Sequence, residues 1–298
     1  MELTYMELRE QICDICHKMW QLGWVAANDG NVSVKLPDGT FLATPTGMSK
    51  SFITPEKLVH IDQDGQILDA SAGLKPSSEI KMHLRVYQEN PRLQAVTHAH
   101  PPMATCFAIA GQPLDAAILT EAILSLGTIP VARYATPGTQ EVPDSIAPFV
   151  NHYNGVLLAN HGALTWGDDI YQAFYRLESV EYYATILMYT GNIIGQQNHL
   201  SCEQVDRLLE IRKNMGITGG GVPPCMNGGQ LTKVCESCAA AGEKTAAAGT
   251  ELAGGSCGGC AAAGGTQTGP QAPLKGVTPL VRPGDAGKMP GGGLGAGS

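Results

Sequence analysis

The feature that most restricts the fold of this chain is an abrupt change of composition at residues 216–224, GITGGGVPP. The 76 residues from 223 to 298 contain no Phe, Trp or Tyr, yet they hold 19 of the 37 glycines. A segment of this kind buries too little apolar surface to offset the conformational entropy that folding removes. We therefore predict one catalytic domain at residues 1–222, followed by a low-complexity, mostly disordered tail at 223–298.

The charge of the chain argues against a nucleic-acid-binding protein. Its formal net charge is −8, whereas nucleic-acid binders normally carry a basic face. No run reaches the roughly 18 apolar residues of a membrane-spanning helix, and the charged start MELTYMELRE lacks the apolar stretch of a secretory signal. We expect a cytoplasmic protein without nucleic-acid or membrane partners, whose nine cysteines are reduced thiols.

Strand and helix signals alternate across residues 1–222, which predicts a mixed α/β fold. Apolar residues at helical spacing predict helices, and short apolar runs bounded by turn residues predict strands. The expected helices span 5–24, 77–90, 103–111, 168–191 and 202–216. Strands are expected on both sides of the turn at 37–39, at 93–100 and at 155–162. The expected helix ends are Ser77 or Ser78, Gly111, Asp168 or Asp169, and Gly191.

Two histidines two residues apart, His98 and His100, lie at the end of the strand predicted at 93–100. Side chains at positions i and i+2 of a strand point to the same face, so both imidazoles project together. Imidazole is a preferred ligand of zinc and other late divalent metals. The alternative is a pair of solvated histidines that precede the turn at Pro101 and Pro102.

Two further residues favour the metal site over that alternative. His161 follows the strand predicted at 155–162, and Glu79 lies in the first turn of the helix predicted at 77–90. Three imidazoles and one carboxylate make a plausible zinc shell, and a carboxylate that can leave the metal opens the position that catalytic zinc requires. The spacing alone does not establish that these residues converge.

Three short polar segments indicate a site for an anion. Hydroxyl groups and free N–H groups at a helix start bind anions, and two tight loops, ANDGN and TPTG, offer further neutral donors. Each loop can also be a plain turn, and the P-loop pattern is absent. Together they can hold a phosphate without Lys or Arg, and the candidate residues are Asn28, Gly30, Asn31, Thr46, Gly47, Ser77 and Ser78.

The segments NDGNVSV, TPTG, KPSSE, THAHP and NHG, in this order, resemble the class II aldolase and adducin family. The resemblance covers about residues 5–215 and is strongest to the fuculose-phosphate aldolase branch. It implies a three-layer α/β/α sandwich with a largely antiparallel central sheet. It also implies a homotetramer with active sites at the subunit interfaces.

The resemblance assigns roles to individual residues. It implies one zinc ion per subunit, bound by His98, His100 and His161. Glu79 would be the fourth ligand at rest and the acid/base in turnover. Tyr134, in PVARYATPGT, would be the catalytic tyrosine that serves a neighbouring subunit. The substrate phosphate would bind to Asn28, Asn31, Thr46, Gly47, Ser77 and Ser78.

The activity that this resemblance implies is the retro-aldol cleavage of a ketose 1-phosphate. L-Fuculose 1-phosphate is the favoured substrate, and it would give dihydroxyacetone phosphate and lactaldehyde. The alternatives are a rhamnulose-phosphate aldolase and an L-ribulose-5-phosphate 4-epimerase-like enzyme, although the epimerases carry Asp where this chain has Glu79. A non-catalytic, adducin-like protein is disfavoured because such members lack the zinc histidines.

The tail contains two CxxC pairs with 18 residues between them. The first pair is Cys235 and Cys238, and the second pair is Cys257 and Cys260. This spacing fits a second metal site of the zinc-ribbon kind, and the alternatives are redox-active or unstructured thiols. A tail on such an aldolase also suggests a tether to the shell of a bacterial microcompartment.

Three more predictions concern single residues of the first 222. We expect Cys13 and Cys16 to lie on the core-facing side of the helix predicted at 5–24 and to pack in the apolar core. We expect His83, four residues after Glu79 on the same helix face, to support the site or pack against it. The remaining histidines, His17, His60, His152 and His199, are expected at the surface.

Overall fold

A single mixed sheet organises the part of the chain that the computed structural model describes, residues 5–227 and 230–231. Within these residues the sheet has eight strands in the order β4-β3-β2-β1-β5-β8-β7-β6. All neighbours pair antiparallel except β6 and β7, which are parallel. The strands are β1 (Asn31–Lys35), β2 (Phe41–Ala43), β3 (Val59–Ile61), β4 (Ile67–Asp69), β5 (Ala95–Ala99), β6 (Val131–Ala132), β7 (Gly155–Leu158) and β8 (Gly162–Gly167).

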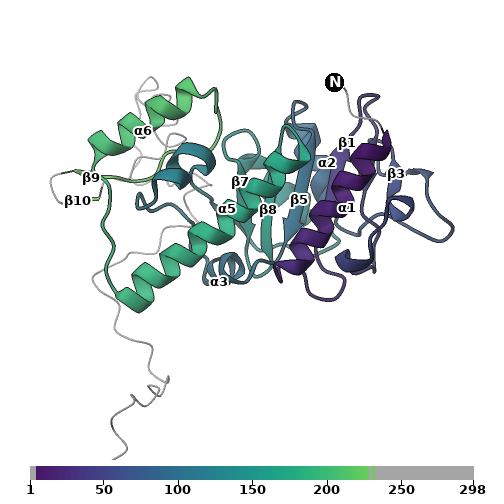
Figure 1. The fold of residues 1–298 in the computed structure, drawn as a ribbon, viewed down its shortest axis with the longest axis horizontal. Helices are drawn as coiled ribbons and strands as arrows, with labels where there is room; N and C mark the ends of the chain where they lie inside the picture. Colours follow the sequence, from purple (N-terminus) through teal and green to yellow (C-terminus); the bar gives the residue numbers. More distant parts are fainter. Residues whose placement is uncertain (1–4, 228–229, 232–298) are drawn as a thin grey trace, which may run out of the picture. The chain divides into compact units, whose positions relative to one another are not determined.

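Helices cover both faces of this sheet, and Figure 1 shows α1 and α5 lying across its near face. The predicted three-layer sandwich with a largely antiparallel sheet is therefore confirmed. The α-helices are α1 (Tyr5–Gln21), α2 (Ile80–Glu89), α3 (Pro102–Ala110), α4 (Glu141–Ile146), α5 (Ile170–Met188) and α6 (Cys202–Asn214).

The alternation of side chains along the strands produces a separate apolar core on each face. In β5, Ala95 packs into the core with α1, α3 and α5, whereas Val96 packs into the core with α2 and α4. In β7, Leu157 faces the first core and Val156 faces the second. Both faces of the central strands β5, β7 and β8 are buried, and most of their side chains are apolar.

Two predicted helix ends are wrong in detail. The helix α2 begins at Ile80 with Glu79 at the N-cap, and the Ser77 hydroxyl accepts the Glu79 N–H at 3.3 Å from just before the helix. The fourth predicted helix, α5, is capped by Asp169 as expected but does not stop at Gly191. A π-helical turn, η5 (Tyr189–Ile194), continues it to Gly195, whose positive φ of 74° ends the helix.

The glycine-rich segment at 216–224, which spans the predicted boundary between the domain and the tail, packs against the domain. Thr128 N–H donates to the Gly220 carbonyl at 2.8 Å, and Gly220 N–H donates to the His152 carbonyl at 3.0 Å. The described structure continues past the predicted boundary at 222, through β9 (Met226–Asn227) to β10 (Gln230–Leu231).

Most of the predicted tail lies outside the described residues. This holds for all four cysteines of the predicted second metal or redox site, Cys235, Cys238, Cys257 and Cys260. The cluster of candidate metal ligands found among the described residues consists of histidines instead. A metal or redox role of the CxxC cysteines therefore stays a prediction.

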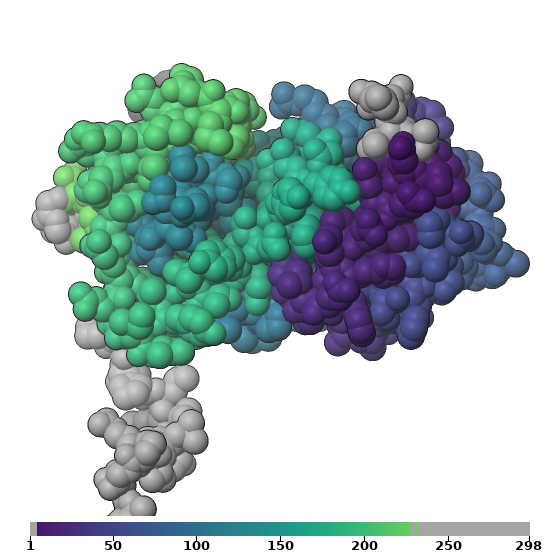
Figure 2. Space-filling view, viewed as in Figure 1, coloured from purple at the N-terminus to yellow at the C-terminus, as the bar shows by residue number. Residues whose placement is uncertain are grey.

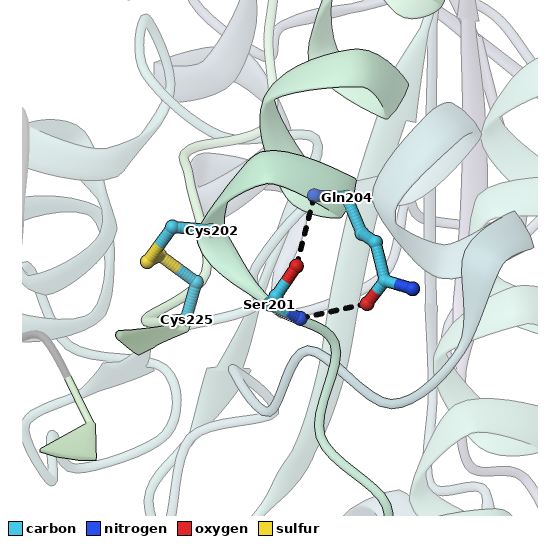
Figure 3. The surroundings of a disulfide bond; sticks show 4 residues. All are labelled: Ser201, Cys202, Gln204 and Cys225. Carbon is cyan, nitrogen blue, oxygen red and sulfur yellow. Dashed lines mark hydrogen bonds between the residues drawn. A yellow bond between two sulfur atoms is a disulfide. The ribbon is translucent and has the colours of Figure 1, made fainter. Parts of the chain in front are cut away.

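A disulfide joins Cys202, the first residue of α6, to Cys225 (Figure 3). Next to it, the Ser201 hydroxyl and the Gln204 side chain form a reciprocal cap with each other's backbone N–H groups. The expectation of reduced thiols is therefore wrong for this pair, and it holds for Cys13, Cys16 and Cys106. Cys13 and Cys16 are buried in the core as predicted, and burial raises the pKa of each thiol to about 12.

The described residues bear on two further predictions, the absence of a membrane-spanning helix and the exposure of four histidines. None of their helices is long and apolar enough to cross a membrane. His152 is exposed as expected, whereas His17, His60 and His199 are half-buried. The space-filling view in Figure 2 shows α1, α5 and α6 at the surface of this face.

Candidate metal centre and anion site

The structure brings together the four residues predicted as metal ligands. His98 and His100 come from the end of β5, His161 from the turn between β7 and β8, and Glu79 from the N-cap of α2. On β5, His98 lies two residues after Val96 and so projects toward the face that α2 covers. Because β5 and β8 are paired in the middle of the sheet, the turn before β8 places His161 beside them. Candidate ligand atoms of the three histidines all lie within 4.8 Å of one another.

The distances between these ligand atoms fit a cation with tetrahedral coordination. His98 Nε2 lies 3.2 Å from His100 Nε2, and the two Glu79 oxygens lie 3.3 Å from His98 Nε2 and from His161 Nε2. Zinc–ligand bonds of about 2.0–2.1 Å in a tetrahedron place the ligand atoms about 3.3 Å apart. The donor set therefore fits a divalent metal of the zinc type.

Hydrogen bonds on the far side of two rings fix which nitrogen faces the centre. His98 Nδ1 lies 2.9 Å from the Ala163 carbonyl oxygen, and His100 Nδ1 lies 3.3 Å from Asp29 Oδ2. Both acceptors require an N–H at Nδ1, so the Nε2 atoms of both rings present lone pairs to each other when the rings are neutral. Two lone pairs at this distance repel, and a cation between them removes the repulsion. Outer partners of this kind orient metal-binding histidines.

Glu79 is held as a carboxylate by its surroundings. The Asn31 amide donates to Glu79 Oε2 at 2.8 Å, because Asn31 pairs with His98 across β1 and β5 and projects to the same face. Burial by itself raises the pKa of the Glu79 carboxyl, but His98, His161 and the Asn31 amide outweigh it and hold this pKa well below its usual range. The other oxygen, Oε1, is buried and accepts no hydrogen bond from the described residues, which suits a group that serves a metal or substrate.

The backbone around His161 is shaped for a close approach. Asn160 adopts a left-handed conformation with φ of 59°, which reverses the chain between β7 and β8. A Cβ at Gly162 would lie 2.5 Å from the Ala99 carbonyl oxygen and 2.6 Å from the His100 ring. Only glycine therefore lets β8 begin directly beside the imidazole of His100.

Two of the predicted anion loops lie side by side. Thr46 N–H donates to the Lys75 carbonyl at 2.9 Å, and Ser77 N–H donates to the Thr44 carbonyl at 3.1 Å. These bonds join the TPTG loop to the segment that precedes α2. The Thr46 and Ser77 N–H groups are used in these bonds, but the hydroxyl groups of Thr46, Ser77 and Ser78 belong to exposed or half-buried residues that a ligand can reach.

The third loop contributes differently. Asn31 is buried and bonded to Glu79, whereas Asn28 is exposed and Gly30 packs against Val25 and the His98 carbonyl. The Asn28 backbone carbonyl accepts a hydrogen bond from Lys50 Nζ at 3.2 Å. Asn31 thus serves the carboxylate of the metal centre, and its predicted contact with a phosphate stays a prediction.

Tyr134, the predicted catalytic tyrosine, is an exposed residue. Its side chain is 60% exposed, after β6. Within residues 5–227, no hydrogen bond or ion pair joins it to the histidines or Glu79. Its assignment to a neighbouring subunit stays a prediction.

Sequence reasoning missed two charged residues near the site, Asp29 and Lys50, and anticipated that His83 packs against it. Asp29 was passed over inside ANDGN, although a carboxylate beside a histidine cluster is a signal for an outer partner. Lys50 carried no signal, because nothing local shows that a lysine is buried. His83 is buried as expected: its Nδ1 lies 2.8 Å from the Ser33 hydroxyl, and burial, together with repulsion from His98 when that ring is protonated, lowers its pKa to about 3.

Several known proteins are similar to this chain in sequence and in fold. The sequence model of the class II aldolase and adducin N-terminal domain matches residues 10–188. A 3-oxo-tetronate 4-phosphate decarboxylase from Escherichia coli K12 is 32% identical over 190 residues, which are 62% of this chain and 88% of that enzyme. An L-fuculose phosphate aldolase from Escherichia coli O6:H1 is 33% identical over 211 residues, which are 71% of this chain and 96% of that enzyme. A solved structure of L-fuculose 1-phosphate aldolase has a TM-score of 0.64 at 30% identity, and the match covers 71% of this chain and 100% of that one.

Proposed function

The chain belongs to the class II aldolase and adducin family, and from this premise we propose that it is a zinc-dependent aldehyde-lyase acting on a ketose 1-phosphate. The favoured substrate is L-fuculose 1-phosphate, which would yield dihydroxyacetone phosphate and lactaldehyde. The observation that carries the proposal is the Glu79 carboxylate held 3.3 Å from two imidazoles of a three-histidine cluster. The relative named L-fuculose phosphate aldolase supports the choice of sugar.

The residues divide the work of cleavage between them. His98, His100 and His161 would hold the zinc ion, which supplies Lewis-acid stabilisation of the negative charge that develops on the substrate oxygens. The loops at Thr46–Gly47 and Ser77–Ser78 would bind the phosphate, which is remote from the breaking bond and orients the sugar.

Two proton transfers complete the reaction. Tyr134 of a neighbouring subunit would take the proton of the C4 hydroxyl as that oxygen becomes the aldehyde. The C3–C4 electron pair would remain on the dihydroxyacetone phosphate half, and C3 would take a proton from Glu79. Because Glu79 is a carboxylate at rest, it would first receive this proton from the Tyr134 hydroxyl through solvent, which leaves Tyr134 as the phenolate that accepts the proton of the C4 hydroxyl. One proton leaves O4 and one arrives at C3, so the charges balance.

A second candidate activity is the decarboxylation of a 3-oxo acid phosphate. It is favoured by the relative named 3-oxo-tetronate 4-phosphate decarboxylase, which covers the same domain. Loss of CO₂ from a 3-oxo acid breaks a carbon–carbon bond beside a carbonyl and leaves an enolate, so it needs the same electrophilic centre. The rhamnulose-phosphate aldolase and epimerase activities remain alternatives on the same scaffold.

A side-by-side assay separates these activities. Zinc-loaded protein is incubated with L-fuculose 1-phosphate, L-rhamnulose 1-phosphate, L-ribulose 5-phosphate and 3-oxo-tetronate 4-phosphate. Release of dihydroxyacetone phosphate, epimer formation and release of CO₂ are measured, and we expect the fastest reaction to be cleavage of L-fuculose 1-phosphate. Bound zinc with no cleavage of any ketose 1-phosphate would overturn the aldolase proposal, and CO₂ release alone would establish the second candidate.

We also propose the assembly and location that go with this activity. A homotetramer would bring Tyr134 to the neighbouring centre, and the enzyme would work in the cytoplasm. The tail at residues 223–298 would tether it to a microcompartment shell, and the two CxxC pairs in that tail would bind a second metal. A reporter fused to residues 223–298 that stays diffuse in cells making such compartments would count against the tether.

A further inference from the structure

The most unusual charged group near the site is Lys50, which follows the Thr46–Gly47 loop at the start of the 3-10 turn η1 (Lys50–Phe52). Its side chain is only 1% exposed. Its Nζ donates to the Asn28 carbonyl at 3.2 Å and to the Met48 carbonyl at 3.0 Å. One buried ammonium therefore holds two loops that are distant in the sequence, and both are predicted to bind the substrate phosphate.

No direct ion pair neutralises this buried cation. In the part of the chain that the structure describes, no carboxylate lies within salt-bridge distance of Lys50 Nζ. Burial lowers the pKa of Lys50, while Cys16, Asp29 and Glu79 act in the opposite direction and favour the charged form. A cation placed in a poorly solvated position without a paired anion destabilises the fold, so a purely structural explanation is unfavourable here.

A ligand with negative charge explains why a lysine is kept at this position. The exposed donors of the anion site are neutral hydroxyl, amide and N–H groups, which bind charged and uncharged ligands alike. Because a charge acts over longer distances in a poorly solvated surrounding than in water, Lys50 adds a positive potential to these donors without touching the ligand.

We propose that Lys50 is a positioning residue that makes the anion site selective for a phosphate group, by fixing the Asn28 and Met48 loops and supplying their buried positive charge. This inference rests on the proposed function, because the phosphorylated substrate is its ligand. It assigns phosphate selectivity to a residue that the substrate does not contact.

The test compares charge-removing variants with a matched lysine. Lys50→Met removes the charge and both hydrogen bonds, whereas Lys50→Gln keeps an amide donor without the charge. Lys57→Met is the control, because Lys57 also donates its Nζ to a backbone carbonyl, that of Phe52, but at the surface. Binding of inorganic phosphate to the zinc-loaded proteins is measured by calorimetry, together with zinc content.

Both Lys50 variants should bind phosphate about tenfold or more weakly, with zinc content unchanged, and Lys57→Met should behave as wild type. The kcat/KM for the ketose 1-phosphate should fall by a similar factor, while that for the unphosphorylated ketose should not. A merely structural role would lower both equally.

Each contrary result has a distinct meaning. Unchanged phosphate affinity in folded Lys50 variants would overturn the role of Lys50 and leave the proposed function standing. Absence of phosphate binding by the wild type would overturn the proposed anion site and this inference together. Failure of both variants to fold with zinc bound would assign Lys50 to the structure alone and also overturn the inference.

Discussion

At the scale of single residues, the site depends on which ring nitrogen of each histidine carries the proton. The Ala163 carbonyl and the Asp29 carboxylate fix Nδ1–H on His98 and His100, so both Nε2 atoms are left for a cation. The carboxylate of Glu79 then faces two rings at 3.3 Å. The same four side chains with other tautomers would not present this donor set.

Glu79→Gln should separate metal binding from turnover. The three histidines remain, so zinc content measured by mass spectrometry should stay at one ion per subunit. Turnover should fall by about 10²–10⁴-fold, because the amide cannot transfer the proton at C3. Glu89→Gln, at the other end of α2, is the control and should keep full activity. An active Glu79→Gln enzyme would show that the acid/base is a different group.

Asp29→Ala should weaken zinc binding without removing any direct ligand. The carboxylate orients the His100 ring through Nδ1, and loss of such an outer partner lowers metal affinity by about 10–100-fold. Competition with a chromophoric chelator measures this affinity. Asp64→Ala, in an exposed turn, should leave it unchanged. Equal zinc affinity for both variants would mean that Asp29 does not orient His100.

His83 should give the protein a pH-dependent stability that a variant can isolate. Its folded pKa is lowered from 6.5 to about 3, so between these values the unfolded chain binds one more proton than the folded chain. The free energy of unfolding therefore falls as the pH is lowered through this window, by up to about 1.4 kcal/mol per pH unit. Above pH 6.5, His83 should no longer make the free energy of unfolding depend on pH.

Urea unfolding of the metal-free protein across this range measures the effect. In His83→Asn the slope of stability against pH should be shallower than in wild type by up to one proton. Parallel slopes for the two proteins would mean that His83 takes up its proton in the folded state as well.

At the scale of elements, the helices are held in place by partners distant in sequence. The Glu181 carboxylate of α5 accepts the N–H groups of Met103 and Ala104 at 3.0 and 2.8 Å, at the start of α3. The helix α3 begins two residues after His100, so this contact also fixes the chain that leaves the metal centre.

The glycine-rich segment at 216–224 acts as a packed strap rather than a linker. A Cβ at Gly220 would clash with the Arg212 guanidinium and lie 2.6 Å from the Leu126 carbonyl, and its φ is 106°. A Cβ at Gly216, with φ of 75°, meets nothing within 4 Å. A side chain at Gly220 would therefore meet both packed neighbours and an unfavourable φ, whereas a side chain at Gly216 would meet the unfavourable φ alone.

Gly220→Ala and Gly216→Ala form a matched pair that tests this packing. Gly216→Ala should lower the free energy of unfolding by about 1 kcal/mol, from backbone conformation alone. Gly220→Ala should cost at least about 2 kcal/mol more, because the added atom also displaces packed neighbours. Urea unfolding measures both. Similar costs at the two positions would contradict a packed strap.

At the scale of the whole molecule, a disulfide ties the C-terminal part of the described chain to α6. Cys202 and Cys225 close a loop across 23 positions and connect the strap to α6. Deleting residues 232–298 should leave the free energy of unfolding unchanged, because the three apolar clusters of the described residues are built without them. Cutting after residue 224 should lower it by about 2–4 kcal/mol through loss of the crosslink.

Full-length Cys225→Ser is the control for this comparison, and it should be destabilised as much as the chain cut after residue 224. Non-reducing peptide mapping would verify the Cys202–Cys225 pair. Equal loss of stability in both deletions would place an essential part of the fold beyond residue 231.

The sequence by itself determined the local features of this protein. Helical periodicity predicted α1, α2, α5 and α6, and strand periodicity placed His98 and His100 on one face. The motif resemblance named the three histidines and Glu79 as partners. These features depend on residue order over a few positions, which a sequence displays directly.

Only the tertiary structure decided which distant groups meet. The central strand β8 escaped prediction because its glycine-bounded segment GALTWG carries no strong strand signal, although it pairs with both β5 and β7. The burial of Lys50, the tautomers set by Ala163 and Asp29, and the packing of Gly220 all depend on strand order and register. Such contacts join segments far apart along the chain, and no local pattern encodes them.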